Sequence, residues 1–307
     1  MSLTLLAEQT LNGFQFGVML FLMAAGLTLI FGVMGLINLA HGSLYMIGAF
    51  SAALVSALTG SFWLALVACL VCSAMAGVIL ERTIIKQLYS RDHLDQVLAT
   101  FALILILSES VRWIFGPFPM YLDVPESLNG SVSIFGFLIY PKYRLFIILI
   151  GLILALALFF LITKTNFGIR IRAGQNDREM ISALGVNISN LYTALFVLGA
   201  SLAGLAGALV GTIQSVEVGM GEPVLILAFV IIVIGGIGSV KGAFVASILV
   251  GSIDTLGRFL IPWSLKFFLD SSTAMSIGSS IASMLIYIFM IFVLIFKPAG
   301  LFGKSLA

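Results

Sequence analysis

Apolar runs of about twenty residues recur along this chain from end to end, and they constrain its fold more than any other feature. A helix of that length crosses a hydrocarbon core roughly 30 Å thick. Of the 307 residues, 61% are hydrophobic and 9% are charged, against roughly 25% charged in an ordinary soluble domain. The runs are continuously apolar and do not alternate, so helices are favoured over a membrane barrel. We therefore expect a single all-α, polytopic transmembrane bundle over residues 1–307.

Nine segments fit a membrane span by hydropathy, but two of them are short. Segments 223–238 and 242–257 each hold sixteen residues, so one or both could be broken or re-entrant helices. We therefore expect eight to nine spans. The nine segments are residues 12–35, 42–59, 62–80, 95–115, 145–163, 190–213, 223–238, 242–257 and 278–296.

The basic residues divide unequally between the two sides that nine spans would create. Ten Lys and Arg residues fall on one side and five on the other. Because cytoplasmic loops are enriched in Lys and Arg, we expect a periplasmic N-terminus and a cytoplasmic C-terminus. No basic residue precedes Arg82, so the first span lacks the charged start of a cleaved signal peptide. The expected cytoplasmic side holds Arg82, Lys86, Arg91, Lys164, Arg170, Arg172, Arg178, Lys241, Lys297 and Lys304, and the other side holds Arg112, Lys142, Arg144, Arg258 and Lys266.

Two loops are long enough to have a function of their own. The expected outer loop, 116–142, contains four prolines and should be extended and partly rigid. The expected cytoplasmic loop, 164–190, contains helix-forming residues between Asn176 and Gly185, which can act as start and stop signals. A short helix on the cytoplasmic face is the interpretation that follows.

A similar pattern occurs twice, in Phe31–Phe50 and in Val230–Leu249. In each, an apolar run reaches a Gly-rich polar break and then restarts. Paired interrupted helices often line a transport path, because the freed backbone groups must face protein or water. An alternative for the first break is a cytoplasmic turn in which Asn38 and Ser43 cap helices. The candidate path residues at the two breaks are Asn38, His41, Gly42, Ser43, Gly235, Gly236 and Gly238.

Two pairs of opposite charges lie near the expected outer ends of spans. Glu109 and Arg112 are three residues apart, and Asp254 and Arg258 are four apart, so each pair shares a helix face. Such pairs commonly anchor a helix at the membrane boundary. Asp254 is the deeper carboxylate, and it joins the path candidates.

The sixth predicted span is rich in small residues. The stretch from Gly199 to Gly211 reads GASLAGLAGALVG. Small residues on one face let a second helix approach closely. We expect Gly199, Gly204, Gly207 and Gly211 to serve helix packing.

The chain lacks the motifs of a nucleotide-driven or hydrolytic enzyme. Gly303-Lys304-Ser305 has Pro298 where a phosphate loop requires its upstream glycine. No catalytic residues, metal ligands or cofactor site can be assembled, since Cys69 and Cys72 have no second pair and no nearby histidine. The near balance of 15 basic and 13 acidic residues offers no surface for nucleic acid.

Four segments together resemble the membrane subunits of bacterial branched-chain amino acid importers. They are spread over nearly the whole chain, and its length is similar to that of the shorter of the two permeases in such systems. The segments are LTLIFGVMGLINLAHGSLYMIGAF from Leu27, LDQVLATFALILILSESVRWIFGP from Leu94, GGIGSVKGA from Gly235 and FKPAGLFG from Phe296.

The resemblance implies a permease subunit of an ATP-binding-cassette importer in the bacterial inner membrane. Its expected partners are a second related permease, two cytoplasmic ATPases, a periplasmic amino acid-binding protein and membrane lipid. The expected cargo is leucine, isoleucine or valine, carried inward by alternating access. Related permeases for urea and short amides look similar, so they remain an alternative.

Importers of this type carry a cytoplasmic Glu-Ala-Ala, three residues, Gly motif that docks into the ATPase. Here Glu179 and Gly185 keep the spacing, while Met180 and Ile181 replace the two alanines. The resemblance therefore implies coupling through this loop without fixing each residue. The candidate coupling residues are Asp177, Arg178, Glu179, Ala183, Leu184 and Gly185.

Two other classes of protein would explain the same hydropathy. A stand-alone secondary transporter would need buried ionisable residues for ion coupling, and Asp254 and Glu109 are its candidates. A membrane-embedded enzyme would need a nucleophile with a base, or a metal set.

Overall fold

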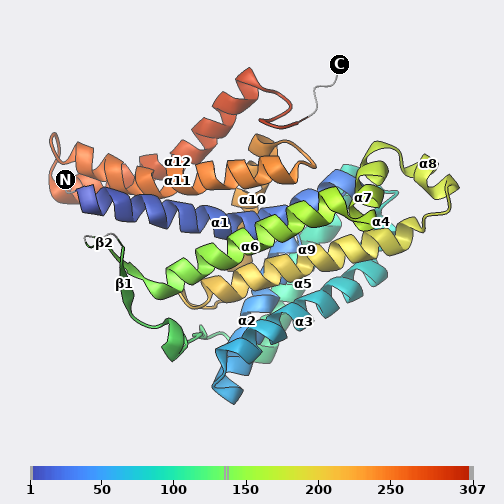
Figure 1. Cartoon of the computed structure of the whole chain (residues 1–307), viewed down its shortest axis with the longest axis horizontal. Coiled ribbons are helices and arrows are strands. Elements are labelled where there is room, and N and C mark those ends of the chain that lie inside the picture. Colours follow the sequence, from blue (N-terminus) through green and yellow to red (C-terminus); the bar gives the residue numbers. More distant parts are fainter. Residues whose placement is uncertain (1–2, 135, 137, 304–307) are drawn as a thin grey trace.

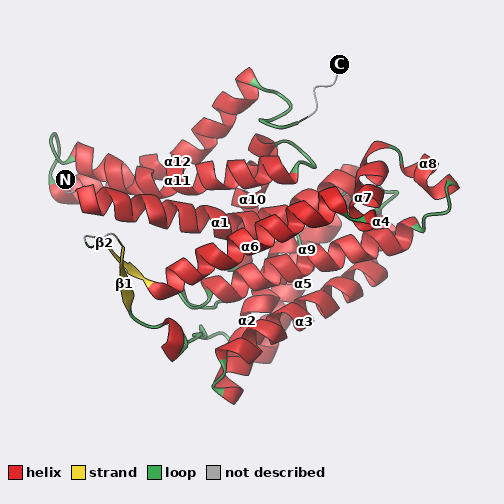
Figure 2. Cartoon of the chain, in the orientation of Figure 1, coloured by secondary structure: helices red, strands yellow, loops and turns green. Residues whose placement is uncertain are grey.

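The computed structural model describes residues 3–134, 136 and 138–303, and it is a helical bundle (Figure 2). Eight of its helices are long and apolar enough to cross a membrane, and a ninth, α10, has 15 residues. Each of the nine predicted spans coincides with one of these helices, so the all-α polytopic fold is confirmed. The nine helices are α1 (Leu3–Met34), α2 (His41–Thr59), α3 (Phe62–Leu80), α5 (His93–Phe115), α6 (Lys142–Lys164), α9 (Ile188–Val210), α10 (Gly221–Gly235), α11 (Val240–Leu265) and α12 (Ser271–Phe296).

The shorter elements lie in the connections between these helices. A π-helical turn, η1 (Glu81–Ile85), and the short α4 (Lys86–Leu88) extend α3. Two helices, α7 (Asn166–Asn176) and α8 (Arg178–Ala183), follow α6. The predicted extended loop after α5 instead contains a 3-10 turn, η2 (Glu126–Leu128), and an antiparallel hairpin of β1 (Ser131–Ile134) and β2 (Leu138–Pro141).

The helix starts agree with the polar residues that precede them. Ser61, Asp92, Asn187 and Asp270 each accept a hydrogen bond from a backbone N–H in the first turn of α3, α5, α9 and α12, respectively. Such caps satisfy backbone donors that have no partner within the helix.

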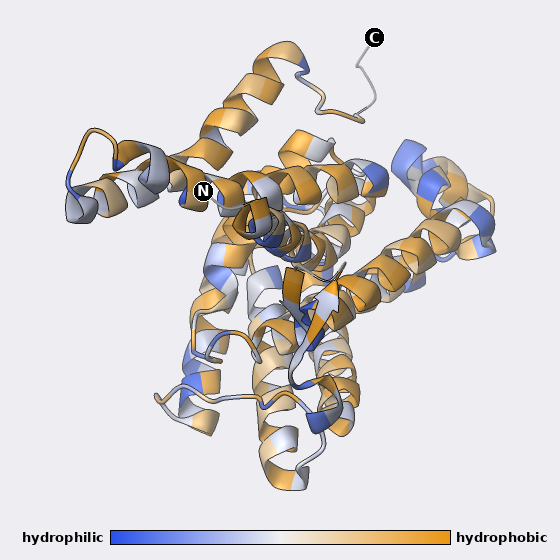
Figure 3. Ribbon diagram, turned by 60° about the vertical axis from the view of Figure 1, so that its left-hand side comes forward, coloured by the Kyte–Doolittle hydropathy of each residue, from blue (hydrophilic) through white to orange (hydrophobic). Residues whose placement is uncertain are grey.

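Helix α1 forms the centre of the bundle. In its most apolar stretch 83% of the residues are buried within the chain, compared with 17% for α6 and for α12. It lies beside α11 along much of its length (Figure 1). The outer helices therefore leave their apolar surfaces to lipid or to another subunit, as the hydropathy colouring of their ribbons illustrates (Figure 3).

Glycines set the closest helix approaches around this centre. A Cβ added to Gly26 of α1 would lie 2.7 Å from the Cα of Gly199 on α9. A Cβ on Gly48 of α2 would overlap Gly204, and one on Gly207 would overlap the backbone of Tyr45. The last glycine of the predicted packing stretch, Gly211, instead lies against Val216 in the following loop.

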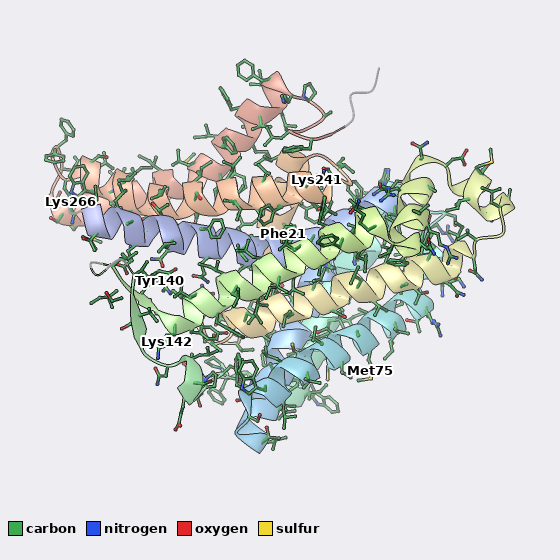
Figure 4. The ribbon with its side chains drawn as sticks, viewed as in Figure 1. Phe21, Met75, Tyr140, Lys142, Lys241 and Lys266 are labelled. Atoms are coloured by element: carbon green, nitrogen blue, oxygen red, sulfur yellow. The ribbon has the colours of Figure 1, made fainter. Side chains whose placement is uncertain are left out.

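The two ends of the bundle carry different connections. Lys142 and Lys266 lie at the end that holds the hairpin, and Lys241 lies toward the opposite end, where α7 and α8 are found (Figures 1 and 4). A bridge between Met120 and Val216 ties the loop before the hairpin to the loop after α9. Lys304, one of the ten residues of the more basic side, lies outside the described residues.

Candidate functional site

The first helix break occupies residues 35–40, between α1 and α2. It begins at Gly35, whose φ of +64° suits glycine because a Cβ is strained there. Asn38 and His41 are both 0% exposed. Among the described residues, the side-chain amide of Asn38 has no hydrogen-bond partner, whereas the imidazole of His41 lies within reach of the backbone of Met23. A buried polar group without a partner in the chain is destabilising unless water or a ligand pairs with it, and in this sense the break is a strained place in the fold.

The capping alternative for this break is wrong. The N-cap residue of α2 is Ala40, and no side-chain hydrogen bond caps the helix. Asn38 lies two residues before the cap, and Ser43 lies inside the helix, 4% exposed. The sequence signal misled because both residues are good cappers, but a cap requires one specific position.

The start of α2 lies against the start of α10. A Cβ on Gly221 would overlap the carbonyl group of Gly42, and a Cβ on Gly42 would lie 2.8 Å from the carbonyl oxygen of Gly221. Helix α10 also begins without a side-chain cap. Two uncapped helix starts thus meet inside the bundle, beside the buried side chain of His41.

The second helix break occupies residues 236–239, between α10 and α11. Gly236 and Gly238 have positive φ values of +98° and +76°. Ser239 caps α11, because its hydroxyl accepts a hydrogen bond 3.0 Å long from the N–H of Gly242. Gly235 packs against Gly242, so the two helices turn back on each other closely.

The C-terminal segment and an open cavity surround this second break. The N–H groups of Leu301 and Phe302 donate to the carbonyls of Ile234 and Gly235 over 2.8 and 3.0 Å. Beside them lies a cavity of about 620 Å³. Its walls include Gly32, Arg172, Gln175, Asn176, Gly238, Ser239 and Pro298.

Asp254 lies away from both breaks and is fully paired. Both of its carboxylate oxygens accept hydrogen bonds from Nε of Arg258, at 2.9 and 3.0 Å. Glu109 and Arg112 likewise form an ion pair, 2.7 Å long, on an exposed face of α5. Both predicted ion pairs therefore exist. Their geometry is compatible with anchoring a helix at the membrane boundary and with a role in transport.

The loop from 164 to 190 folds into α7 and α8. The sequence predicted a helix between Asn176 and Gly185, and α8 begins after Asp177, whose carboxylate accepts from the N–H of Met180 over 2.9 Å. Gly185 ends this segment with φ at +85°. The helix α7 was missed, because its polar sequence carries no span signal.

The surface of α8 is largely open. Met180 and Leu184 are 59% and 76% exposed, while Ile181 is buried. Glu179, Ala183 and Gly185 are also exposed. The side chain of Arg178, another predicted coupling residue, lies outside the described residues. The loop thus presents an exposed apolar pair beside a carboxylate, which suits docking to another protein.

Sequence reasoning missed Gln96, which holds the first break in place. This residue is 3% exposed. Its amide oxygen accepts from the N–H of Ile37 over 3.2 Å, and its amide nitrogen donates to the carbonyls of Leu88 and Arg91. The signal available in the sequence was Gln96 itself, a polar residue near the start of the apolar segment 95–115.

Sequence reasoning also missed Glu81, which begins the π-helical turn. It is 0% exposed. Its carboxylate accepts from the hydroxyl of Tyr89 over 2.6 Å and from that of Thr193 over 2.7 Å. The pKa of Tyr89 is raised above its ordinary value, mainly because the residue is buried and in smaller part because its hydroxyl bonds to Glu81. The π turn thus fastens the end of α3 to α9, in a geometry often found at functional positions.

No group of three or more potential metal-ligating side chains occurs within residues 3–134, 136 and 138–303. The two cysteines are free thiols, and Cys69 is packed in the core.

Residues 9–294 match the family described as the branched-chain amino acid transport system / permease component. The chain belongs to this family. The match includes both helix breaks and the loop of residues 164–190, so the candidate path and coupling residues lie within the shared region.

Relatives support the same assignment over nearly the full length. The chain is 28% identical to the high-affinity branched-chain amino acid transport system permease protein BraD of Pseudomonas aeruginosa, over 97% of this chain and 95% of that protein. It is 27% identical to the protein LivH of Escherichia coli K12, with the same coverage. The permease protein LivM of Salmonella typhimurium is 26% identical over 74% of this chain and 59% of its own length. No solved structure matches the chain.

Proposed function

We propose that this chain is a permease subunit of an ATP-binding-cassette importer that moves leucine, isoleucine and valine into the cytoplasm. The observation that carries the proposal is the family match over residues 9–294, together with relatives named for branched-chain amino acid transport. The chain has no phosphate loop of its own. The energy for transport therefore comes from partner ATPases, and this chain is not the enzyme.

The proposed assembly contains a second permease, two cytoplasmic ATPases and a periplasmic binding protein. The similarity to LivM supports a related permease as the partner. The exposed apolar sides of α5, α6 and α12 are available for lipid and for this subunit. The excess of Lys and Arg at the end with α7 and α8 supports an orientation in the inner membrane with this end toward the cytoplasm and the N-terminus toward the periplasm.

Substrate passes the helix breaks at residues 35–40 and 236–239. The amide of Asn38, which has no partner among the described residues, gives the first break a group that can bind a passing zwitterion or its water, and the imidazole of His41 lies at the start of the next helix. The second break adjoins the cavity on the proposed cytoplasmic side. Alternating access then requires the packed starts of α2 and α10 to separate from each other during the cycle.

Uptake of radiolabelled leucine into proteoliposomes tests this function. The full importer, with binding protein outside and ATP inside, is expected to accumulate leucine, whereas this chain alone is not. Accumulation by the chain alone would favour a secondary transporter. Uptake of urea or acetamide in place of leucine would reassign the substrate.

The coupling surface is tested by Glu179→Arg in the same importer. Reversing this charge on the exposed face of α8 is expected to abolish the stimulation of ATP hydrolysis by loaded binding protein. The matched control is Glu126→Arg, which reverses an exposed carboxylate at the other end of the bundle. Equal stimulation in both variants would remove α8 from the coupling surface.

A further inference from the structure

A cavity of about 470 Å³ lies toward the hairpin end of the bundle, which the proposed orientation makes the periplasmic end. Its walls come from α1, α2, α6, the end of α9 and the loop after it, α10 and α11. This volume is within the range of sites that bind small molecules. The cavity belongs to neither helix break, and none of the predicted path residues lines it.

One side of this cavity carries a positive charge. Arg144 of α6 donates one hydrogen bond to the side-chain oxygen of Asn12, which also accepts from the hydroxyl of Tyr140 over 3.1 Å. Asn12 and Tyr140 thus hold the guanidinium at the wall, near the strand end at which Tyr140 lies (Figure 4). Since a guanidinium has five N–H donors, others remain for a ligand.

Arg144 forms no ion pair within the described part of the chain, although the carboxylate of Glu8 lies near Tyr140. The two ion pairs found there are Glu109 with Arg112 and Asp254 with Arg258. The residues that line the cavity include no Asp and no Glu. An arginine at a half-closed wall whose lining holds no carboxylate favours binding of a carboxylate group from outside the chain.

The rest of the lining divides into neutral polar groups and an apolar wall. Gln9, Gln214 and Thr255 offer amide and hydroxyl oxygens, which can accept hydrogen bonds from an ammonium group. The apolar wall includes Phe16, Leu20 and Leu227. A branched aliphatic side chain could be covered by this wall while its charged groups stay at the polar side.

We propose that this cavity is a periplasmic-side subsite for a zwitterionic aliphatic amino acid, with Arg144 receiving its carboxylate. The assignment rests on the proposed function and extends it to named residues. Since only neutral acceptors face the ammonium group, the subsite holds its ligand weakly. Weak binding suits an intermediate site that receives the amino acid from a high-affinity binding protein and releases it into the transport path.

Photolabelling of the assembled importer in detergent, without binding protein, tests the subsite. The probe is a leucine analogue with a diazirine in its side chain, and peptide mass spectrometry locates the adducts. Labelling is expected on the apolar wall, at Phe16, Leu20 or Leu227. Excess leucine should prevent it, whereas leucinamide, which lacks the carboxylate, should not.

Substitution of Arg144 separates recognition from folding. Arg144→Gln is expected to weaken competition by leucine about tenfold or more, since a charge-assisted hydrogen bond is lost. Arg112→Gln is the matched control, because Arg112 lies at the same end but outside the cavity. The control should leave competition unchanged. Elution of each variant as an intact complex checks assembly.

A second variant tests the cavity without altering the charge. Leu227→Trp fills the apolar side, and it is expected to abolish labelling at the cavity. Ile226→Trp, on the same helix but 53% exposed and outside the lining, should retain it. These two variants test whether the analogue occupies the cavity by changing only the space available to it. The proposal therefore remains testable even if Arg144→Gln fails to assemble.

The outcomes separate the subsite from the proposed function. If the wild-type importer takes up leucine but labelling misses the cavity, or leucinamide competes as well as leucine, the subsite is overturned and the function stands. If the wild-type importer does not take up leucine, the proposed function fails, and the subsite for this substrate fails with it.

Discussion

The two helix breaks share a sequence pattern, but they differ in whether their polar side chains form hydrogen bonds and cap the helix that follows. At residues 35–40 the break is partly buried, α2 begins without a side-chain cap, and the amide of Asn38 has no partner among the described residues. At residues 236–239 the break borders a cavity, and Ser239 caps the following helix. An interrupted helix can thus be either strained or relaxed within one fold.

This difference indicates a division of roles between the breaks. A relaxed break, capped and tied to the C-terminal segment, suits a fixed turn. A strained break suits a place that changes its contacts during transport, since buried polar groups without partners are often found at functional sites. The following predictions test this division, from the largest expected effect to the smallest.

The largest effect is expected at the contact between the starts of α2 and α10. Gly221→Val places a branched side chain against the carbonyl of Gly42, and overpacking of this kind destabilises by about 3 kcal/mol. Thermal unfolding in detergent measures the loss. Gly60→Val is a control with open space around the added Cβ, where only its φ of +67° is strained. Similar losses of stability in both variants would mean that the close contact between Gly42 and Gly221 does not contribute to the effect.

The next effect is a gain in stability at the strained break. Asn38→Leu at this break, and Thr28→Val within α1, each remove a buried polar group that lacks a partner among the described residues, and each is expected to raise the free energy of unfolding by about 1–3 kcal/mol. Denaturant unfolding measures that gain. If Asn38 serves the path, its variant should also lose transport. A less stable Asn38→Leu protein would show that the amide is well satisfied.

At the second break, residues 236–239, removing a polar side chain should lower the stability of the protein. Ser239→Ala removes the cap of α11 and is expected to lower the free energy of unfolding by about 1 kcal/mol. Ser239→Asn, which can still cap, should retain most of the stability. A stabilising Ser239→Ala substitution would erase the contrast between the two breaks.

The smallest effect is a pH response at the exposed start of α12. Hydrogen bonds from Ser272 and Thr273 hold the pKa of Asp270 below its usual range. A lowered pKa favours the folded state above the ordinary aspartate value of about 3.9, and this contribution is lost as the pH falls below it. Comparing thermal unfolding at about pH 5 and pH 3 with that of Asp270→Asn isolates the contribution, because asparagine caps without titrating. Identical pH profiles for both proteins would contradict this assignment.

Hydropathy and charge predicted the helices well, because crossing a bilayer demands long apolar segments. Helix α1 nevertheless begins at Leu3, well before the predicted residue 12, since a few polar residues do not stop a helix. The helix α7 and the hairpin were missed for a related reason: they lie outside the apolar runs.

The site was less accessible to sequence reasoning than the fold. The glycines and polar residues at both breaks were identified, but the state of their hydrogen bonds was not. The contact between Gly42 and Gly221 joins residues far apart in the chain, and no local pattern encodes it. Their roles in transport remain predictions.

The central position of α1 has a consequence for biogenesis. Helix α1 leaves the ribosome well before α11, which packs along it and follows after about 200 further residues. At roughly 5–20 residues per second, synthesis of that interval takes about ten to forty seconds. During this delay the face of α1 that carries Gly13 and Gly17, which packs against Gly251 and Ser247 of α11, must be shielded by lipid or by the insertion machinery. A prematurely terminated chain would leave this face open to mispairing and degradation.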